Sequence, residues 1–263
     1  SVAAAQASPP ATGALDAFIL EQLAQRKVPG LSLAIVDGGR IAYARGYGVT
    51  APGGTEPVTP ATLFLAGSVS KSVAAAGALR LVEAGSLTLD GNVNDKLVTW
   101  KVPENAFTAS EKVTVARILS HTAGLTVHGF AGYNRDVPVP TVSQVLDGAP
   151  PANSPPVRAD TVPGSRWKYS GGGDTILQLL MEDVTGQPFA PWMQANVLAP
   201  FGMTSSTFLN PLPQAWWDRA AAGTWPGRPV EGGWHVYPEM AAAGLWSTAS
   251  DLARFIIGVQ ESF

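Results

Sequence analysis

Cysteine is absent from the 263-residue sequence, so the chain can form neither a disulfide nor a reactive thiolate. Charged residues make up only 14%, and the net charge of −3 provides no basic field for a nucleic acid. The three histidines, His121, His128 and His235, are not spaced as a metal-ligand cluster. No apolar run reaches the roughly 18 residues of a membrane span. We therefore expect no nucleic-acid partner, no membrane span and no metal.

What the chain does have is apolar material, at 46%, which is enough for one large domain or two closely packed ones. Its first ten residues are small, polar and rich in proline, and we interpret 1–10 as a disordered leader remnant. Within them, Ala5-Gln6-Ala7 has the small-x-small form of a signal-peptidase site. This pattern favours an exported, periplasmic or secreted bacterial protein over an ordinary frayed terminus.

The pair Ser68 and Lys71 begins an alanine-rich segment that is typical of a helix. A spacing of three residues places the hydroxyl and the amine on one helix face. Unpaired N–H groups at a helix start favour an alkoxide and the oxyanion that follows its attack. A lysine in a dry pocket can act as the base that activates a serine. On spacing alone, Ser68 is equally well explained as a helix N-cap.

A second S-x-x-K, Ser165 to Lys168, serves as an internal control for this motif. It lies between Val162-Pro163-Gly164 and a triple glycine, in turn-forming sequence where no helix fixes the spacing. Only the first copy is therefore predicted to have the geometry that the chemistry needs.

Hydrophobic periodicity and turn residues predict the main elements. We expect an amphipathic helix with Phe18, Ile19 and Leu23 on its buried face, followed by two strands around a tight turn at 37–39. Leu79 and Leu81 are core candidates on the helix after Lys71. The expected strands are 31–36 and 40–47, and the expected helices are 15–26, 72–84, 115–120, 142–146, 174–185, 189–197 and 252–259.

Several separated segments resemble the serine β-lactamase and penicillin-binding protein superfamily, including its class C β-lactamases, D-peptidases and family VIII carboxylesterases. The segments are 29–36, 64–71, 118–125, 169–171, 198–204 and 242–252. The resemblance implies an α+β fold, an α/β sandwich with an antiparallel sheet plus a helical insertion. It places the α/β layer in residues 11–60 and 225–263, and a mostly helical region carrying the nucleophile in 61–224.

The same resemblance implies roles for three side chains. Ser68 is the catalytic nucleophile, Lys71 and Tyr169 handle its proton, and the backbone N–H of Ser68 donates to the oxyanion. In this family, the third position of the tyrosine motif is usually an asparagine that contacts substrate, but here it is Gly171. Losing that amide shifts our expectation away from β-lactam hydrolysis toward ester or peptide-like substrates.

Aromatic residues in two long loops are candidates for contacting the substrate. In the loop 129–164 and after it, we single out Phe130, Tyr133 and Trp167 together with Gly171, although simple packing is the favoured explanation for each aromatic. Four tryptophans in the loop region 210–238, Trp216, Trp217, Trp225 and Trp234, favour either packing or a cleft for an acyl group. His121 is expected to bond the last carbonyls of the preceding helix and not to catalyse.

Members of the resembled family continue beyond the last expected helix with further strands and a K-T-G or H-x-G motif. Neither K-x-G nor H-x-G occurs in this sequence. We therefore expect the fold to be incomplete at its C-terminus. A C-terminal remainder, as a separate chain or a second copy of this one, is the expected partner, since it would cover an open strand edge.

These observations predict a serine hydrolase that forms an acyl-enzyme on a small-molecule or short-peptide substrate without an organic cofactor. A carboxylesterase is favoured. The alternatives are a D-aminopeptidase, a DD-carboxypeptidase or a β-lactamase that uses the same residues, and a non-catalytic binding or regulatory relative. The motif G-x-S-x-G is absent, which disfavours the α/β-hydrolase fold as another source of a serine esterase.

Overall fold

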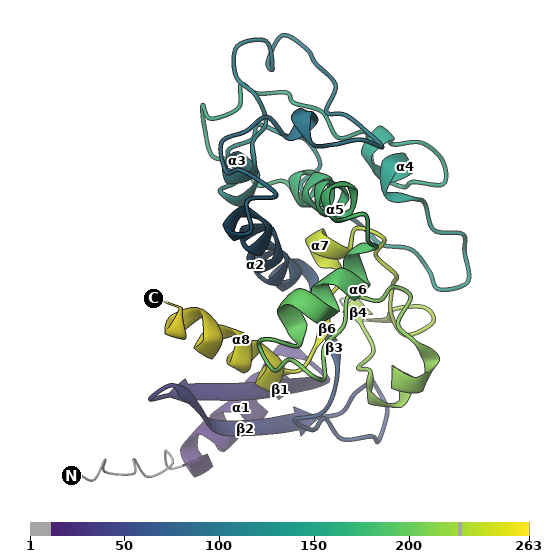
Figure 1. Cartoon of the computed structure of the whole chain (residues 1–263). Helices are drawn as coiled ribbons and strands as arrows, with labels where there is room; N and C mark the ends of the chain where they lie inside the picture. Colours follow the sequence, from purple (N-terminus) through teal and green to yellow (C-terminus); the bar gives the residue numbers. More distant parts are fainter. Residues whose placement is uncertain (1–11, 226–227, 263) are drawn as a thin grey trace, which may run out of the picture.

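The fold was analysed in a computed structural model, which describes residues 12–225 and 228–262 (Figure 1). The expected leader remnant 1–10, with Ala5-Gln6-Ala7, lies outside the described residues. One layer of the molecule is a strand hairpin between two helices. It consists of α1 (Thr12–Arg26), β1 (Gly30–Asp37), β2 (Arg40–Gly48) and α8 (Ala249–Glu261). The two ends of the sequence therefore build one layer together.

The hairpin is antiparallel, with Gly30 opposite Gly48 and Asp37 opposite Arg40. Its turn needs glycine because Gly38 and Gly39 have φ values of 58° and 72°. Helix α8 packs against both strands, and α1 packs against β2. Side chains alternate across the ladder, so Leu31 and Leu33 lie on the same face of the hairpin. They pack against a small core formed by Ile19 and Leu23 of α1 and Tyr47 of β2. The prediction for Phe18 was wrong, because its side chain is 58% exposed.

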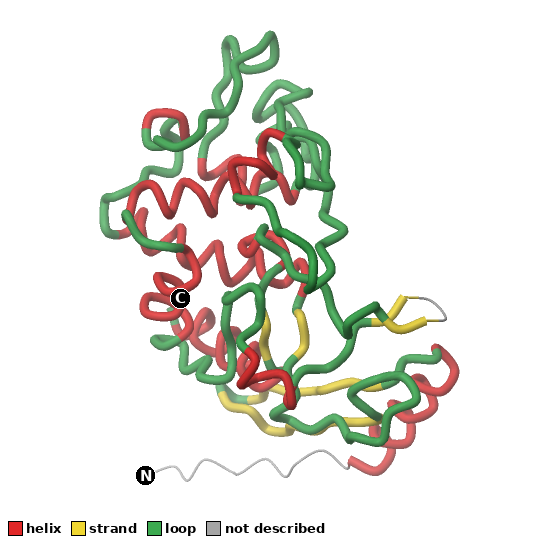
Figure 2. Tube along the Cα trace, turned by 90° about the vertical axis from the view of Figure 1, so that its right-hand side faces the viewer, coloured by secondary structure: helices red, strands yellow, loops and turns green. Residues whose placement is uncertain are grey.

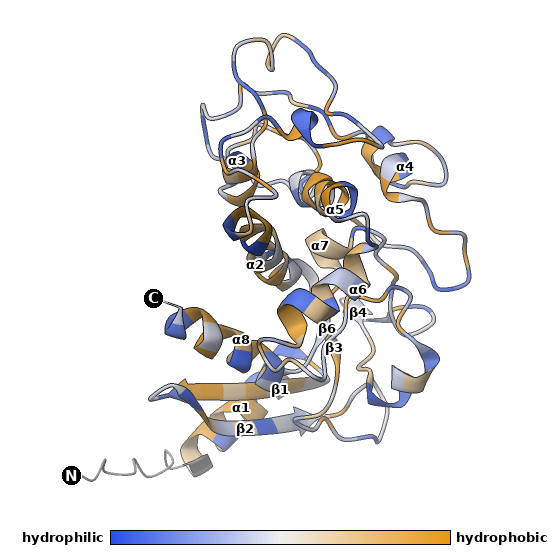
Figure 3. Ribbon diagram, viewed as in Figure 1, coloured by the Kyte–Doolittle hydropathy of each residue, from blue (hydrophilic) through white to orange (hydrophobic). Residues whose placement is uncertain are grey.

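A second part, in which helices are joined by long loops, rises above this layer (Figures 1 and 2). It contains α2 (Ser70–Glu83), η2 (Val93–Asp95), α3 (Val115–Leu119), α4 (Val142–Asp147) and α5 (Gly171–Thr185). Helix α5 is its centre, since every residue from Gly171 to Met181 is buried. Figure 3 shows hydrophobic turns in both α5 and α2, and these helices share the main core. Leu81 joins that core, but Leu79 is 47% exposed, contrary to the prediction.

The observed boundaries of α3 and α4 agree with the predicted ones to within one residue, whereas α5 and α8 each begin three residues earlier than predicted. Thr114 caps α3, as predicted, by accepting the Arg117 N–H. Helix α5 begins at Gly171, three residues early, because Ser170 caps it by accepting the Gly173 N–H at 3.1 Å. Likewise, Thr248 accepts the Asp251 N–H at 3.1 Å, so α8 begins at Ala249.

The remaining elements join the two parts. Strand β3 (Phe64–Leu65) pairs antiparallel with β6 (Trp246–Ser247), and Figure 2 shows both between the hairpin and the helices. Helix α7 (Met240–Ala243) packs against α2 and α5. The others are α6 (Phe189–Met193), the π-helical η3 (Gln194–Leu198), η4 (Gln214–Arg219), β4 (Thr224–Trp225) and β5 (Arg228–Pro229). The predicted mixed fold with small antiparallel sheets is confirmed. Within the described ranges, no helix has the length and apolarity needed to cross a bilayer.

Candidate active site

Ser68 lies in η1 (Gly67–Val69), a single 3₁₀ turn that leads from β3 into α2. The cap positions of η1 and α2 are Ala66 and Val69, so the N-cap explanation of Ser68 does not apply. Ser70 holds the turn, since its hydroxyl donates to the Gly67 carbonyl at 2.5 Å and accepts the Leu245 N–H at 2.9 Å. Ser68 is exposed at this turn, whose N–H groups of Val69 and Ser70 donate to the carbonyls of Ala66 and Gly67.

Lys71 lies one turn further on and points back to Ser68. Its Nζ donates to Ser68 Oγ at 3.2 Å and to the carbonyl oxygen of Ala242 at 2.6 Å. Ala242 belongs to α7, so a contact across 171 residues of sequence fixes the amine. A neutral amine in this place can donate to Ala242 and still accept the hydroxyl proton of Ser68.

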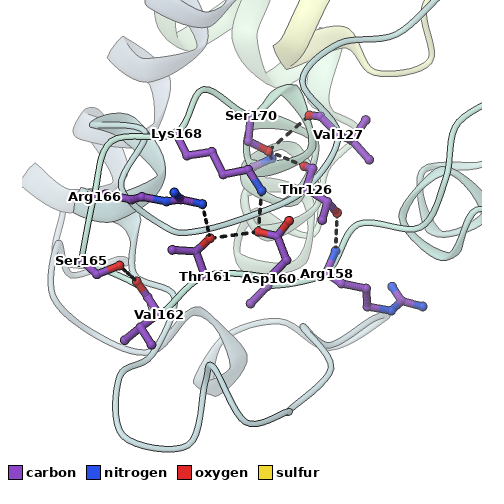
Figure 4. A network of polar contacts seen from close by, with 12 residues as sticks. Thr126, Val127, Arg158, Asp160, Thr161, Val162, Ser165, Arg166, Lys168 and Ser170 are labelled. Carbon is purple, nitrogen blue, oxygen red and sulfur yellow. Dashed lines mark hydrogen bonds and ion pairs between the residues drawn. The ribbon is translucent and has the colours of Figure 1, made fainter.

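The second S-x-x-K has a different structure, as its turn-forming sequence predicts. Lys168 forms an ion pair with Asp160, and the hydroxyl of Ser165 donates to the Val162 carbonyl at 2.7 Å (Figure 4). Serine and lysine there point to separate partners in a loop. This copy cannot activate a nucleophile.

Tyr169 lies over Lys71 and between two histidine rings. Its ring centroid is 5.1 Å from Lys71 Nζ, 4.4 Å from the His121 ring and 4.7 Å from the His128 ring. In the described part of the chain, no hydrogen bond joins its phenol to Ser68 or Lys71. The aromatic contacts therefore position the ring, and its hydroxyl is available for a substrate.

The side chain of His121 does not bond the helix carbonyls as expected, although its backbone N–H donates to the Ile118 carbonyl at 3.0 Å. Its backbone φ is +55°, which turns the ring toward Tyr169, and its Nδ1 accepts the Ser170 N–H at 3.4 Å. Burial, reinforced by the charges of Lys71 and His128, lowers the pKa of His121. A neutral imidazole thus supports the tyrosine motif from one side.

The other candidate residues differ in their exposure and in their contacts. Trp167 is 67% exposed, with its ring 6.4 Å from that of Tyr169. Tyr133 is buried and its hydroxyl accepts the Asn153 N–H at 3.0 Å. A Cβ on Gly171 would lie 3.2 Å from both the Phe130 ring and the His128 carbonyl oxygen. Phe130 thus occupies the space that a side chain at residue 171 would need.

Two buried carboxyl groups beside the site were missed in the sequence. Asp174, in the first turn of α5, is 3% exposed and its Oδ2 has no hydrogen-bond partner among the described residues. Burial raises its pKa to about 7, although Lys71 opposes the shift. Glu239, just before α7, is fully buried, and neither of its carboxyl oxygens has a hydrogen-bond partner in the described part of the chain. Burial raises its pKa to about 7. The position of Asp174 in a helix start was visible, but nothing signalled its burial.

No group of three or more histidine, aspartate or glutamate side chains in the described ranges is arranged to hold a metal ion.

Comparisons with known proteins found similar sequences and folds. The family model described as Beta-lactamase matches residues 15–262. Esterase EstB of Burkholderia gladioli is 28% identical over 286 aligned positions, which cover 94% of this chain and 69% of that protein. Among solved structures, the octameric penicillin-binding protein homologue from Pyrococcus abyssi is 30% identical with a TM-score of 0.77, covering 96% of this chain. A class C β-lactamase is 25% identical with a TM-score of 0.71, covering 93% of this chain. The chain spans 57% and 63% of those two structures.

Proposed function

Because the chain belongs to the Beta-lactamase family, we propose that it is a serine hydrolase that cleaves carboxylic esters through an acyl-enzyme on Ser68. The observation that carries the proposal is the contact of 3.2 Å between Lys71 Nζ and Ser68 Oγ. The single 3₁₀ turn that presents Ser68, and the failure of the second S-x-x-K to reproduce the arrangement, support it.

In the proposed reaction, Ser68 Oγ attacks the ester carbonyl carbon as its proton passes to Lys71 Nζ. The backbone N–H of Ser68 stabilises the oxyanion. When the C–O bond to the alcohol breaks, the leaving oxygen takes a proton that Tyr169 delivers from Lys71. Water then attacks the acyl carbon and gives one proton to Lys71 Nζ, which passes it to Ser68 Oγ as the ester bond to Ser68 breaks and the carboxylic acid leaves.

Esters are favoured over amides by two observations. The similar Burkholderia protein is an esterase, and Gly171 with Phe130 against it leaves no side-chain amide at a position that could hold a substrate amide. The likeness to a class C β-lactamase supports β-lactam hydrolysis as a second candidate. A D-aminopeptidase, a DD-carboxypeptidase and a non-catalytic relative are the remaining alternatives.

Labelling with a fluorophosphonate probe tests the proposal directly. The wild-type protein should be labelled at Ser68 and should hydrolyse p-nitrophenyl butyrate, whereas Ser68→Ala should lose both. Ser165→Ala is the matched control, because it removes the serine of the other S-x-x-K. Parallel assays with nitrocefin and a D-Ala-D-Ala peptide separate the alternative substrates.

Equal labelling of wild type and Ser68→Ala would refute the nucleophile. Labelling without turnover of any of the three substrates would favour the non-catalytic alternative.

A further inference from the structure

A pocket of about 240 Å³ lies against β3, the strand that precedes the turn with Ser68. Phe64 and Leu65 of β3 form one wall, the segment 221–225 forms a second, and Trp234, His235 and Tyr237 belong to a third. Strand β3 runs directly into η1, so Leu65 is three residues from Ser68. The Cα atoms of Leu65 and Ser68 are therefore at most about 11 Å apart.

The third wall of this pocket is bonded to the loop beside the tyrosine motif. His235 Nδ1 and Tyr237 Oη both contact the Ala131 carbonyl oxygen, at 2.8 Å and 3.3 Å. The neighbouring Phe130 is the residue that fills the space at Gly171. The walls of the pocket thus connect β3, which precedes the turn with Ser68, to the loop that packs on the start of α5.

Among the described residues, the lining has no aspartate, glutamate, lysine or arginine. His235 Nδ1 and the hydroxyl of Tyr237 bond Ala131, and the buried Trp234 Nε1 is a neutral donor with no partner among the described residues. What faces the pocket is mainly aromatic and small aliphatic surface, and burying a carboxylate or ammonium there would leave the charge unpaired. A neutral apolar group suits this lining, whereas the carboxylate end of a D-Ala-D-Ala peptide does not.

The volume sets the size of that group. A dry cavity of about 150 Å³ is enough for a benzene molecule. We propose that the pocket binds the acyl chain of the ester substrate, a neutral chain of about four to eight carbons or a phenyl ring. This inference rests on the proposed function, since it deepens the specificity of the same site.

The decisive variant is Ala222→Leu, which adds three carbons to the wall. The backbone N–H of Ala222 donates to the Thr50 carbonyl at 2.8 Å, so the segment is fixed and the added volume reduces the pocket. Trp225→Ala is the opposite change, because Trp225 lines the pocket and is 46% exposed. Ala109→Leu, on an exposed loop outside the lining, is the matched control.

Wild type should show a higher kcat/KM for p-nitrophenyl hexanoate than for the acetate. Ala222→Leu should lower the hexanoate-to-acetate ratio by about tenfold or more, the scale of crowding by one or two methylenes. Trp225→Ala should shift the optimum to longer chains, and Ala109→Leu should keep the wild-type ratio. An unchanged ratio in both pocket variants would overturn the inference.

Failure of the proposed function is distinguishable. In that case, fluorophosphonate does not label Ser68 in any variant, and no ester is cleaved. The pocket is then tested by binding, since Trp225 and Trp234 lie in its walls. Hexanamide should change the tryptophan fluorescence of wild type saturably, but not that of Ala222→Leu. The absence of a saturable change in wild type would contradict the pocket itself.

Discussion

The hydroxyl of Tyr169 can be removed without disturbing the contacts of its ring. Those contacts, with His121, His128 and Lys71, are made by the ring face. Tyr169→Phe should therefore keep the fold and lower kcat for ester hydrolysis by about 10²- to 10⁴-fold, the usual contribution of a positioned acid or base. KM should change little. Steady-state kinetics with p-nitrophenyl butyrate, and a thermal unfolding control, measure both effects.

A fall of less than about threefold in kcat would show that Tyr169 only packs in the site. His121→Ala is the useful comparison, because it leaves the phenol but removes one ring that orients it.

Glu239 makes stability depend on pH with a sign opposite to that of most carboxyl groups. Burial raises its pKa to about 7 in the folded state, so the unfolded chain loses this proton first as pH rises. The free energy of unfolding should therefore decrease between about pH 4.5 and 7, by on the order of 3 kcal/mol for this one group. Asp174, also raised to about 7, acts in the same sense.

Glu239→Gln should reduce the fall in the free energy of unfolding over this pH range, because the amide cannot ionise. Urea unfolding at pH 5 and pH 8 measures it, with Glu104→Gln on the surface as the control. The interpretation would be wrong if wild type and Glu239→Gln lost the same stability over this range.

At the residue scale, the sequence predicted what spacing alone determines. The contact between Ser68 and Lys71 follows from their separation within one helical turn, and the failure of Ser165 and Lys168 follows from their turn-forming neighbours. Burial of Asp174 and Glu239 depends on how α5 and α7 pack, which no local pattern encodes.

Among the elements, the junction of η1 and α2 carries the site, and Ser70 holds it. Ser70→Ala removes the acceptor of the Leu245 N–H, which is buried and would then have no partner. The free energy of unfolding should fall by about 1–3 kcal/mol. Labelling of Ser68 should also slow, since the junction positions both Ser68 and Lys71. Urea denaturation and timed fluorophosphonate labelling check the two effects.

Ser72→Ala, on an exposed face of α2, is the matched control and should be neutral. If the two variants behaved alike, the bond from Ser70 to Leu245 would have no part in holding the turn.

Element boundaries were predictable where a cap is encoded in the sequence. Thr114 marks the start of α3, and Gly85, with φ of +73°, follows α2 as expected. The triple glycine was harder, because glycine disfavours helix and suggests a bend. Here Ser170 caps the helix, and glycine is required for a tertiary reason: a Cβ on Gly172 would come within 2.8 Å of the Thr126 carbonyl oxygen. Leu79 and Phe18 were misplaced because several apolar positions compete for one buried face.

For the whole molecule, the resemblance led to the correct fold, because separated segments keep a fixed order along the chain. Its family and its mixed α/β architecture are confirmed. The division into 11–60 with 225–263 and 61–224 stays a prediction. No periodicity could show that β3 pairs with β6, or that α7 closes over α2, since these contacts join residues about 170 to 180 positions apart.

The bond from Lys71 to Ala242 has a consequence for searching genomes with short patterns. A gene product that stopped before residue 240 would contain the serine, the lysine and the tyrosine in their proper order. A search for these three residues would find it, but the amine of its lysine would lack the carbonyl that positions it. A search pattern for such proteins should therefore include the alanine-rich segment near residue 242 as well as Ser68.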